Sequence, residues 1–295
     1  MLLSTVYMKR LKDVVDEARR EGRAVGHFNV ATLDMLRGVA QAAAGLNLPV
    51  VIGVSEGERS ALGVRQIAAL IKSLREETGQ EIYLNADHTT SLGSAKAAVD
   101  AGFDAVLADG SALALDDNVA YTRQVVAYAK SKNPDILVEG EMGLIGRGSQ
   151  VLSEVPAEVA TAELTTPEAA SEFSLATGVD LLAPAVGNLH GVLANRPNPN
   201  LDIERVRAIS ATVNLPLVLH GGSGTSDEDV TAAIKAGCAI VHVSTELRLA
   251  WRDALRRSLA DNPDEAAPYK LLKPALQAVE KVTAAKLKLF NNIDK

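Results

Sequence analysis

Three of the five histidines in this chain stand at or just beyond the ends of apolar runs, which makes them candidates for binding a metal ion. The histidines are His27, His88, His190, His220 and His242. His88 ends the run "IYLNADH", His190 follows "LLAPAVG", and His220 lies within "LPLVLHGG". Three neutral imidazoles fill three positions of a tetrahedral zinc site and leave the fourth open for a reactant. A single histidine of this kind is more often a structural residue, so the prediction of a metal site depends on finding three together.

Three acidic residues are expected beside these histidines. Asp87 directly precedes His88, Asp109 ends the run "AVLAD", and Glu141 lies within "VEGEMG". A carboxyl group next to an open metal position is well placed to exchange a proton with a metal-bound oxygen, and Asp87 is the candidate for that role. Asp109 and Glu141 are candidates for a direct role in the chemistry, and the alternative is structural, either as partners that orient the metal histidines or as helix caps.

A glycine-rich segment predicts where a phosphate group would bind. The segment "HGGSGTSDEDV" (220–230) separates an apolar run from a helical pattern, and "VSTEL" (243–247) ends the last run. Free backbone N–H groups in such loops and at helix N-termini bind anions. An ordinary turn is the alternative, but loops after the seventh and eighth strands of a barrel are the usual phosphate site, which favours the phosphate interpretation.

Eight apolar runs separated by helical patterns must position these residues. The predicted strands are 24–30, 49–55, 82–88, 105–111, 136–143, 181–187, 215–222 and 240–247. Helical patterns lie between them, such as "SDEDVTAAIKAG", which is expected to begin at the N-cap Ser226 and to end at Gly237. Eight β-α units in about 250 residues predict an α/β fold of the (β/α)8 or TIM-barrel type, in which the C-terminal ends of all strands meet at one mouth. A doubly wound sheet is less favoured because no glycine-rich dinucleotide loop follows the first strand.

No Gly/Ser-rich linker divides the chain, so residues 1–295 are predicted to form a single domain. Two segments are not part of the eight predicted strand–helix units. Residues 144–165 form a long connection that is a candidate mobile lid. Residues 262–295 predict a C-terminal helical extension for packing or oligomerisation. The first 23 residues indicate an amphipathic helix and not a targeting segment.

Composition limits the classes of partner and of chemistry. A net charge of −7 and a pI near 5.4 argue against nucleic acid as a partner. No stretch approaches the roughly 20 apolar residues of a membrane span, so no membrane association is expected. The single cysteine, Cys238, excludes an intrachain disulfide and a cysteine zinc cluster, and fits a cytoplasmic protein. The predicted strands contain no lysine, which disfavours a Schiff-base lyase and leaves the metal route.

With these motifs assembled, the sequence resembles the class II, zinc-dependent ketose-bisphosphate aldolases, the family of fructose- and tagatose-bisphosphate aldolases. The similarity runs nearly end to end through "FNV", "NADHTTSLGSAKAAVDAGFDAVLADGS", "VEGEMG", "TTPEAASEF", "ATGVDLLAPAVGNLHG", "LPLVLHGGSG" and "LFNNIDK". The resemblance implies a TIM barrel with a C-terminal helical extension that acts as a homodimer or homotetramer on sugar phosphates. It further implies a glycolytic-type lyase that reversibly cleaves fructose 1,6-bisphosphate to dihydroxyacetone phosphate and glyceraldehyde 3-phosphate through a zinc-stabilised enediolate.

The resemblance also implies roles for particular residues. The implied metal ligands are His88, His190 and His220, with Asp109 and Glu141 at an inner or alternative metal position. Asp87 matches the acidic residue that handles the proton of the aldehyde-derived hydroxyl, and Glu154 in the lid is the candidate base for the C3 proton. The implied substrate and phosphate contacts are Asn29, Ser55, Gly191, Gly221, Gly222, Ser223, His242, Ser244, Thr245 and Arg248. Family members often bind a monovalent cation such as Na+ or K+ near the phosphate.

Several positions bear on the choice of substrate. Arg248 matches an arginine that holds the distal phosphate in relatives that prefer fructose 1,6-bisphosphate. Asn85, His242 and Ser244 depart from the family pattern, which commonly has His, Asn and a distinguishing acidic residue there. The leading prediction is fructose 1,6-bisphosphate. The alternatives are tagatose 1,6-bisphosphate, a deoxy-sugar acid phosphate and, last because the metal ligands are retained, a non-catalytic sugar-phosphate-binding subunit.

Overall fold

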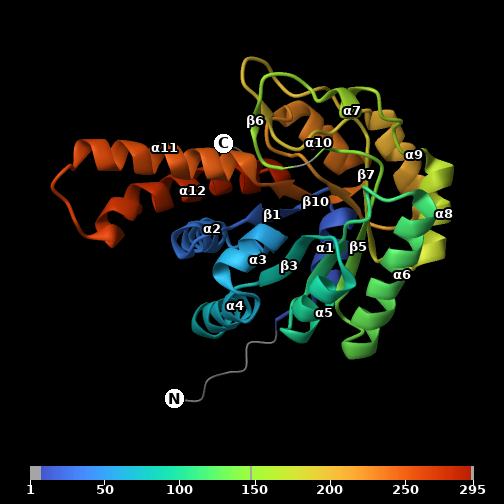
Figure 1. The fold of residues 1–295 in the computed structure, drawn as a ribbon, viewed down its shortest axis with the longest axis horizontal. Coiled ribbons are helices and arrows are strands. Elements are labelled where there is room, and N and C mark those ends of the chain that lie inside the picture. Colours follow the sequence, from blue (N-terminus) through green and yellow to red (C-terminus); the bar gives the residue numbers. More distant parts are fainter. Residues whose placement is uncertain (1–7, 147, 294–295) are drawn as a thin grey trace.

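A closed barrel of eight parallel strands forms the centre of the protein in a computed structural model, which describes residues 8–146 and 148–293 (Figure 1). Around the barrel the hydrogen-bonded order is β1 (Val25–Asn29), β10 (Cys238–Val243), β9 (Leu217–Leu219), β7 (Leu181–Pro184), β5 (Leu137–Met142), β4 (Ala105–Ala108), β3 (Ile82–Thr89) and β2 (Val50–Val54). The short strands β6 (Val151–Leu152) and β8 (Val192–Leu193) pair with each other outside it. The predicted (β/α)8 barrel is confirmed.

Helices surround the strands, and several of them begin at side-chain caps. They are α1 (Leu11–Arg20), α2 (Leu33–Leu46), α3 (Glu56–Leu62), α4 (Val64–Thr78), α5 (Leu92–Asp100), α6 (Leu115–Lys132), α7 (Ala157–Ala160), α8 (Pro167–Thr177), α9 (Ile203–Val213), α10 (Asp227–Ala236), α11 (Thr245–Asp261) and α12 (Pro268–Phe290). The side chains of Thr32, Ser91 and Thr166 each accept the backbone N–H three residues on. Ser226 caps α10 and Gly237 ends it, as predicted.

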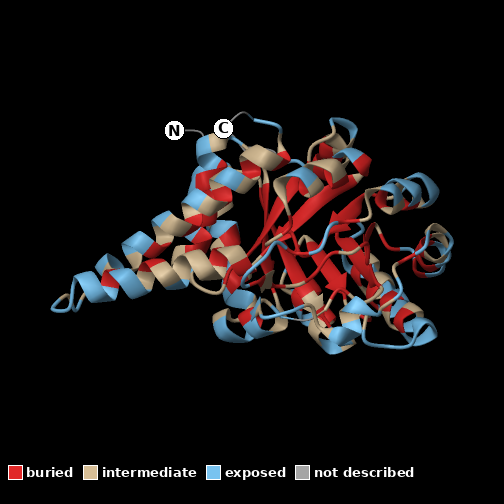
Figure 2. Cartoon of the chain, turned by 90° about the horizontal axis from the view of Figure 1, so that it is seen from above, coloured by how far each residue is buried: buried red, intermediate tan, exposed pale blue. Residues whose placement is uncertain are grey.

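The lower interior of the barrel is apolar and is closed by α1. Alternate strand residues point inward. Near the strand starts the inward side chains include Val25, Val51, Tyr83, Leu137 and Leu181, which pack with Leu11, Val14, Val15 and Ala18 of α1. A second apolar cluster fills the space between strands and outer helices. In Figure 2 the strands are buried and the outer helix faces are exposed. The polar residues of the mouth therefore lie at the opposite end of the barrel from a buried apolar base.

The predicted C-terminal extension is a helix, and with α11 it forms an arm. Helix α12 packs against both α2 and α11, and the α11–α12 hairpin projects from the barrel in Figures 1 and 2. The predicted N-terminal amphipathic helix begins at Leu11, and residues 1–7 lie outside the described part of the chain. No helix in the described ranges is long and apolar enough to cross a membrane.

Four predicted strand ends are wrong. Residues 109–111, 185–187 and 220–222 lie outside β4, β7 and β9, and Thr245–Leu247 already belong to α11, so these three strands and β10 end earlier than predicted. Apolar composition does not show where a strand stops pairing with its neighbours at the barrel mouth, because the apolar run continues in the sequence beyond the last paired residue. In the 144–165 connection the described residues form only β6 and α7 as regular elements. Its mobility stays a prediction.

Candidate metal centre and substrate cavity

The backbone at His88 brings two consecutive side chains to the barrel mouth. On β3, Tyr83, Asn85 and Asp87 share the inward face, so a regular strand would direct His88 outward. His88 instead has a positive φ of 41°, and the β3–β4 register shifts between Ala86 and Thr89. Positive φ is uncommon for a residue with a Cβ. This local distortion lets both Asp87 and His88 face the cavity.

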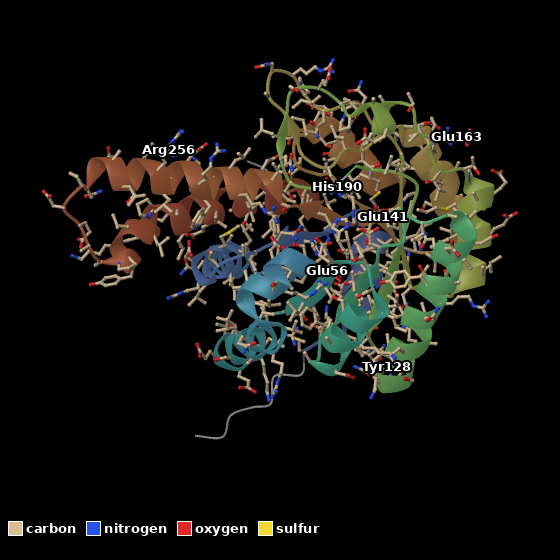
Figure 3. All side chains as sticks on the ribbon, viewed as in Figure 1. Glu56, Tyr128, Glu141, Glu163, His190 and Arg256 are labelled. Carbon is tan, nitrogen blue, oxygen red and sulfur yellow. The ribbon has the colours of Figure 1, made fainter. Side chains whose placement is uncertain are left out.

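Three imidazoles converge at the mouth. Ligand nitrogens of His88, His190 and His220 all lie within 4.8 Å of one another, and their ring centroids are 4.9 to 5.3 Å apart. His190 Nε2 is 3.2 Å from His220 Nδ1. Two nitrogens on one tetrahedral zinc, each about 2.05 Å from it, lie about 3.3 Å apart. The spacing of the predicted ligands therefore fits a single ion. In Figure 3, His190 and Glu141 lie close together over the barrel.

Hydrogen bonds orient two of these rings. His190 Nδ1 is 2.9 Å from the carbonyl oxygen of Gly146, which only accepts, so Nδ1 holds the proton and Nε2 faces the centre. His220 Nε2 is 2.8 Å from Glu139 Oε1, which leaves Nδ1 toward the centre. Burial lowers the pKa of both His190 and His220 to about 3, so both rings are neutral, as metal ligands must be.

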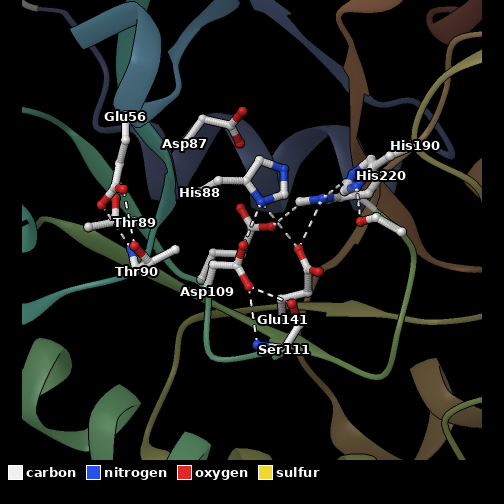
Figure 4. Close-up of polar contacts among 12 residues, drawn as sticks. Glu56, Asp87, His88, Thr89, Thr90, Asp109, Ser111, Glu141, His190 and His220 are labelled. Carbon is white, nitrogen blue, oxygen red and sulfur yellow. Dashed lines mark hydrogen bonds and ion pairs between the residues drawn. The ribbon is translucent and has the colours of Figure 1, made fainter. Parts of the chain in front are cut away.

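Carboxylates complete the centre on its other side (Figure 4). His88 Nδ1 lies 2.9 Å from Asp109 Oδ2 and 3.7 Å from Glu141 Oε2, and these three residues form a second group with metal-ligand spacing. Burial by itself would lower the pKa of His88, but the charges of Asp87, Asp109 and Glu141 raise it to about 10. The ring of His88 is thus the one imidazole of the three that is protonated while no metal is bound.

One buried oxygen tests whether a cation fits here. Glu141 Oε2 is buried and has no hydrogen-bond partner among the described residues, although His220 Nδ1 is only 3.4 Å away. Burial raises the pKa of Glu141 to about 8. A divalent ion at the centre would supply the partner that this oxygen lacks. Imidazole and carboxylate donors suit zinc and related divalent ions, so the residues present fit a metal.

Asp87 is held by one hydrogen bond and lies close to a second imidazole. Its Oδ2 accepts a hydrogen bond of 2.8 Å from Asn29 Nδ2, and its Oδ1 lies 3.5 Å from His242 Nδ1. Burial alone would raise the pKa of Asp87, but the positive charge of His88 and the His242 hydrogen bond hold it well below its usual range. The carboxylate is therefore ionised and fixed in place.

A polar layer lies beneath the mouth, and the sequence analysis assigned no role to one of its residues, His27. The rings of His27 and His242 stack at 3.5 Å with 5° between their planes, and His242 also stacks on His220 at 4.2 Å. Asn85 Nδ2 is 3.1 Å from His27 Nε2, and Gly53 leaves room for the His27 ring, which a Cβ there would meet at 2.1 Å. His27 and His242 also lie within metal-ligand spacing of Asp87, so this stack adjoins the group of His88, His190 and His220. One pattern in the sequence indicated this position of His27. His27 lies two residues before Asn29, so both side chains point to the same face of the strand.

A cavity of about 350 Å³ opens above this layer. The predicted site residues that line it are Asn29, Ser55, Asp87, His88, Asp109, His190, Gly191, Gly221, Ser223, His242, Ser244, Thr245 and Arg248. His220 and Glu141 lie just below its surface. Glu154 is exposed in the 144–165 connection and is not part of the lining.

The glycine-serine end of the cavity is built from two loops and the start of α11. Ser223 Oγ accepts the backbone N–H groups of Ser244 and Glu246, each at 3.2 Å. The Gly222 N–H donates to the carbonyl oxygen of His242, so this predicted phosphate contact already has a backbone hydrogen-bond partner. Ser149 of the 144–165 connection donates to Ser244 Oγ at 2.9 Å, which ties that connection to the same end. Gly221 has a φ of 69°, which favours glycine there.

Comparisons with known proteins agree with this geometry. The chain is 35% identical over 286 residues to a probable fructose-bisphosphate aldolase of Bacillus subtilis (strain 168), covering 96% of this chain and 97% of that one. It is 36% identical over 282 residues to a 6-phospho-5-dehydro-2-deoxy-D-gluconate aldolase of Shouchella clausii (strain KSM-K16), covering 95% and 93%. The crystal structure of the YdjI aldolase from Escherichia coli K12 superposes with a TM-score of 0.81 at 29% identity, covering 96% and 97%.

The family model described as fructose-bisphosphate aldolase class-II matches residues 9–295. The match includes all the strands of the barrel and all three histidines of the proposed metal centre. The relatives differ in their named substrates, whereas the aldolase class is common to them. This chain belongs to the class II fructose-bisphosphate aldolase family.

Proposed function

We propose that this protein is a metal-dependent aldolase that reversibly cleaves fructose 1,6-bisphosphate to dihydroxyacetone phosphate and glyceraldehyde 3-phosphate. The observation that supports it best is the position of Asp87, an ionised carboxylate beside three converging imidazoles in one cavity. A glycine- and serine-lined end of the same cavity suits a phosphate group. Among the described residues, no strand contains a lysine, so the strands offer no amine for a Schiff base.

The residues of this chain would divide the work between them. His88, His190 and His220 would hold a zinc-type ion, with Asp109 and Glu141 on its other side. When bound, such an ion polarises a ketone and stabilises negative charge that develops on its oxygen. During cleavage the ionised carboxylate of Asp87 would take the proton from the hydroxyl group that becomes the aldehyde oxygen, and during condensation the protonated form of Asp87 would return that proton to the same oxygen.

The two ends of the cavity would hold the substrate. Gly191, Gly221, Ser223, Ser244 and Thr245 would bind the phosphate next to the ketone, where a monovalent cation such as Na+ or K+ would add charge. Glu154 would remove the C3 proton, and its exposed position requires the 144–165 connection to close over the mouth. Glu154→Gln should therefore slow exchange of the C3 proton of dihydroxyacetone phosphate with solvent. Unchanged exchange would remove Glu154 from this role.

Two observations support a second candidate substrate. The deoxygluconate-phosphate aldolase is as similar to this chain as the fructose-bisphosphate aldolase. Arg248, which would hold a distal phosphate, is already bound to a carboxylate, Glu58. The second candidate is therefore a 6-phospho-5-dehydro-2-deoxy-D-gluconate aldolase with the same metal and proton chemistry.

Cleavage assays on a substrate panel test the proposal. The panel contains fructose 1,6-bisphosphate, tagatose 1,6-bisphosphate and 6-phospho-5-dehydro-2-deoxy-D-gluconate, each with the protein as purified, after chelation and after zinc is returned. We expect the highest kcat/KM with fructose 1,6-bisphosphate and no activity after chelation. A higher kcat/KM on another substrate would overturn the fructose assignment alone. Full activity without metal would refute the metal-dependent aldolase. No activity on any substrate would favour the non-catalytic sugar-phosphate-binding subunit.

We also propose that the protein works as a homodimer or homotetramer. The support is the α11–α12 hairpin, which projects from the barrel and exposes about half or more of Leu259 and Tyr269. Light scattering of the purified chain across concentrations tests this. A monomer at every concentration would refute it.

A further inference from the structure

Arg248, at the rim of the substrate cavity, is bound to a buried carboxylate. Its Nη2 lies 2.6 Å from Glu58 Oε1, and the Glu58 side chain is 5% exposed whereas that of Arg248 is 37% exposed. Arg248 is on α11 and Glu58 on α3, 190 residues earlier in the chain. The guanidinium therefore points one edge inward at Glu58 and leaves other N–H groups toward the cavity.

The second oxygen of Glu58 continues this contact into the site. Glu58 Oε2 accepts the Ser55 backbone N–H at 2.7 Å and Asn29 Nδ2 at 2.9 Å. Asn29 Nδ2 also donates to Asp87 Oδ2 at 2.8 Å. The two hydrogens of one amide thus hold two carboxylates, and Glu58, Asn29 and Asp87 are all buried. Because carboxylates only accept, the amide has one orientation that satisfies both.

We propose that Glu58 is a positioning residue that couples Arg248 to the carboxylate of Asp87. The ion pair with Arg248 fixes Glu58, Glu58 fixes the Asn29 amide, and that amide fixes Asp87 Oδ2. The inference rests on the proposed function, in which Asp87 handles the proton of the aldehyde oxygen. Arg248 then has a role besides binding a distal phosphate, namely to fix Glu58. This role would matter for the reaction of a substrate that has no distal phosphate as well. An anion bound by Arg248 would contact the same guanidinium as Glu58, the residue that orients Asp87 through Asn29.

Glu58→Gln is the sharpest variant because it preserves the fold locally. Ser55 and Glu58 form a capping box at the start of α3, and glutamine makes the same box. Its carbonyl oxygen can accept from Ser55 and Asn29, which turns its NH2 group toward Arg248 and removes the ion pair. Arg248→Gln removes the same pair from the other side. Arg252→Gln is the matched control, since Arg252 lies one turn further along α11 and pairs with Asp253.

Two reactions of the zinc-loaded protein separate positioning from damage. One is condensation of dihydroxyacetone phosphate with glyceraldehyde, which lacks a distal phosphate. The other is exchange of the C3 proton of dihydroxyacetone phosphate with solvent, which does not use Asp87. We expect Glu58→Gln and Arg248→Gln each to lower kcat of condensation about tenfold and to leave the exchange rate within about twofold. The double variant should be no slower than either single variant, and Arg252→Gln should match the unmodified protein.

Three results would overturn the coupling. If Arg248→Gln raises KM for phosphorylated aldehydes and leaves glyceraldehyde condensation unchanged, Arg248 only binds the distal phosphate, and the proposed function stands. If exchange and condensation fall together in Glu58→Gln, the effect is general damage to the site. If the unmodified protein with zinc shows neither reaction, the proposed function fails and the coupling fails with it.

Discussion

Glu139 Oε1 lies 2.8 Å from His220 Nε2, and both side chains are enclosed by the barrel. The contact leaves Nδ1 of His220 directed at the neighbouring imidazole of His190, 3.2 Å away. Carboxyl groups that hold the far nitrogen of a metal histidine orient the ring and raise its basicity. Glu139 therefore belongs to the candidate metal centre although it does not line the cavity.

A pair of variants tests this role of Glu139. Burial raises the pKa of Glu139 well above its usual range, so glutamine is a fair substitute for the neutral acid. We expect Glu139→Gln to keep zinc affinity within about threefold, and Glu139→Leu, which leaves His220 Nε2 unpaired, to weaken it about 10- to 100-fold. Competition titration with a chromophoric chelator measures both. Wild-type affinity in Glu139→Leu would show that the ring needs no such partner.

Removal of an imidazole should remove the metal. In His220→Ala the centre keeps two of its three converging rings, so we expect less than about one tenth of the wild-type zinc after dialysis and a loss of turnover of about 1,000-fold or more. Elemental analysis and the cleavage assay measure these. Cys238→Ala, a change in the same barrel away from the mouth, should keep its zinc. The ligand assignment is refuted if His220→Ala retains both zinc and turnover.

Gly53 should be intolerant of even one methyl group. A Cβ at this position would lie 2.1 Å from the ring of His27, which has no free space to move into between Asn85 and His242. We expect Gly53→Ala to lower the free energy of unfolding by about 1–3 kcal/mol. Gly45, in α2 with nothing near its Cβ position, is the matched control, and Gly45→Ala should raise it by up to about 1 kcal/mol. Urea denaturation gives both values, and equal effects would contradict the steric argument.

Cys238 should be inert in the native protein and should make stability depend on alkaline pH. Burial raises the pKa of its thiol to about 12, above the value of about 8.5 in an unfolded chain. The neutral thiol stabilises the fold fully below pH 8.5, and this contribution is lost as the pH rises from 8.5 toward 12. Between pH 8 and pH 10 the free energy of unfolding should fall about 2 kcal/mol more for the native sequence than for Cys238→Ala. Iodoacetamide should label the thiol at pH 8.5 only after denaturant is added, and rapid native labelling would disprove the burial argument.

The sequence by itself determined the fold and which polar side chains stand at the barrel mouth. Apolar runs at regular spacing predicted the eight strands, because a strand that is covered on both faces consists mostly of apolar residues. Those ends then identified Asp87, His88, Asp109 and His220 as residues of one mouth, since parallel strands in a barrel share the direction of their C-terminal ends.

Only the tertiary structure decided how these side chains meet. The positive φ of His88 and the shifted β3–β4 register are backbone features without a residue-type pattern, and they let neighbours in sequence face the same cavity. The His27–His242 stack and the Arg248–Glu58–Asn29–Asp87 chain join residues from opposite ends of the sequence. Such partners depend on closure of the barrel, which sets β1 beside β10, and a local pattern contains no information about that contact.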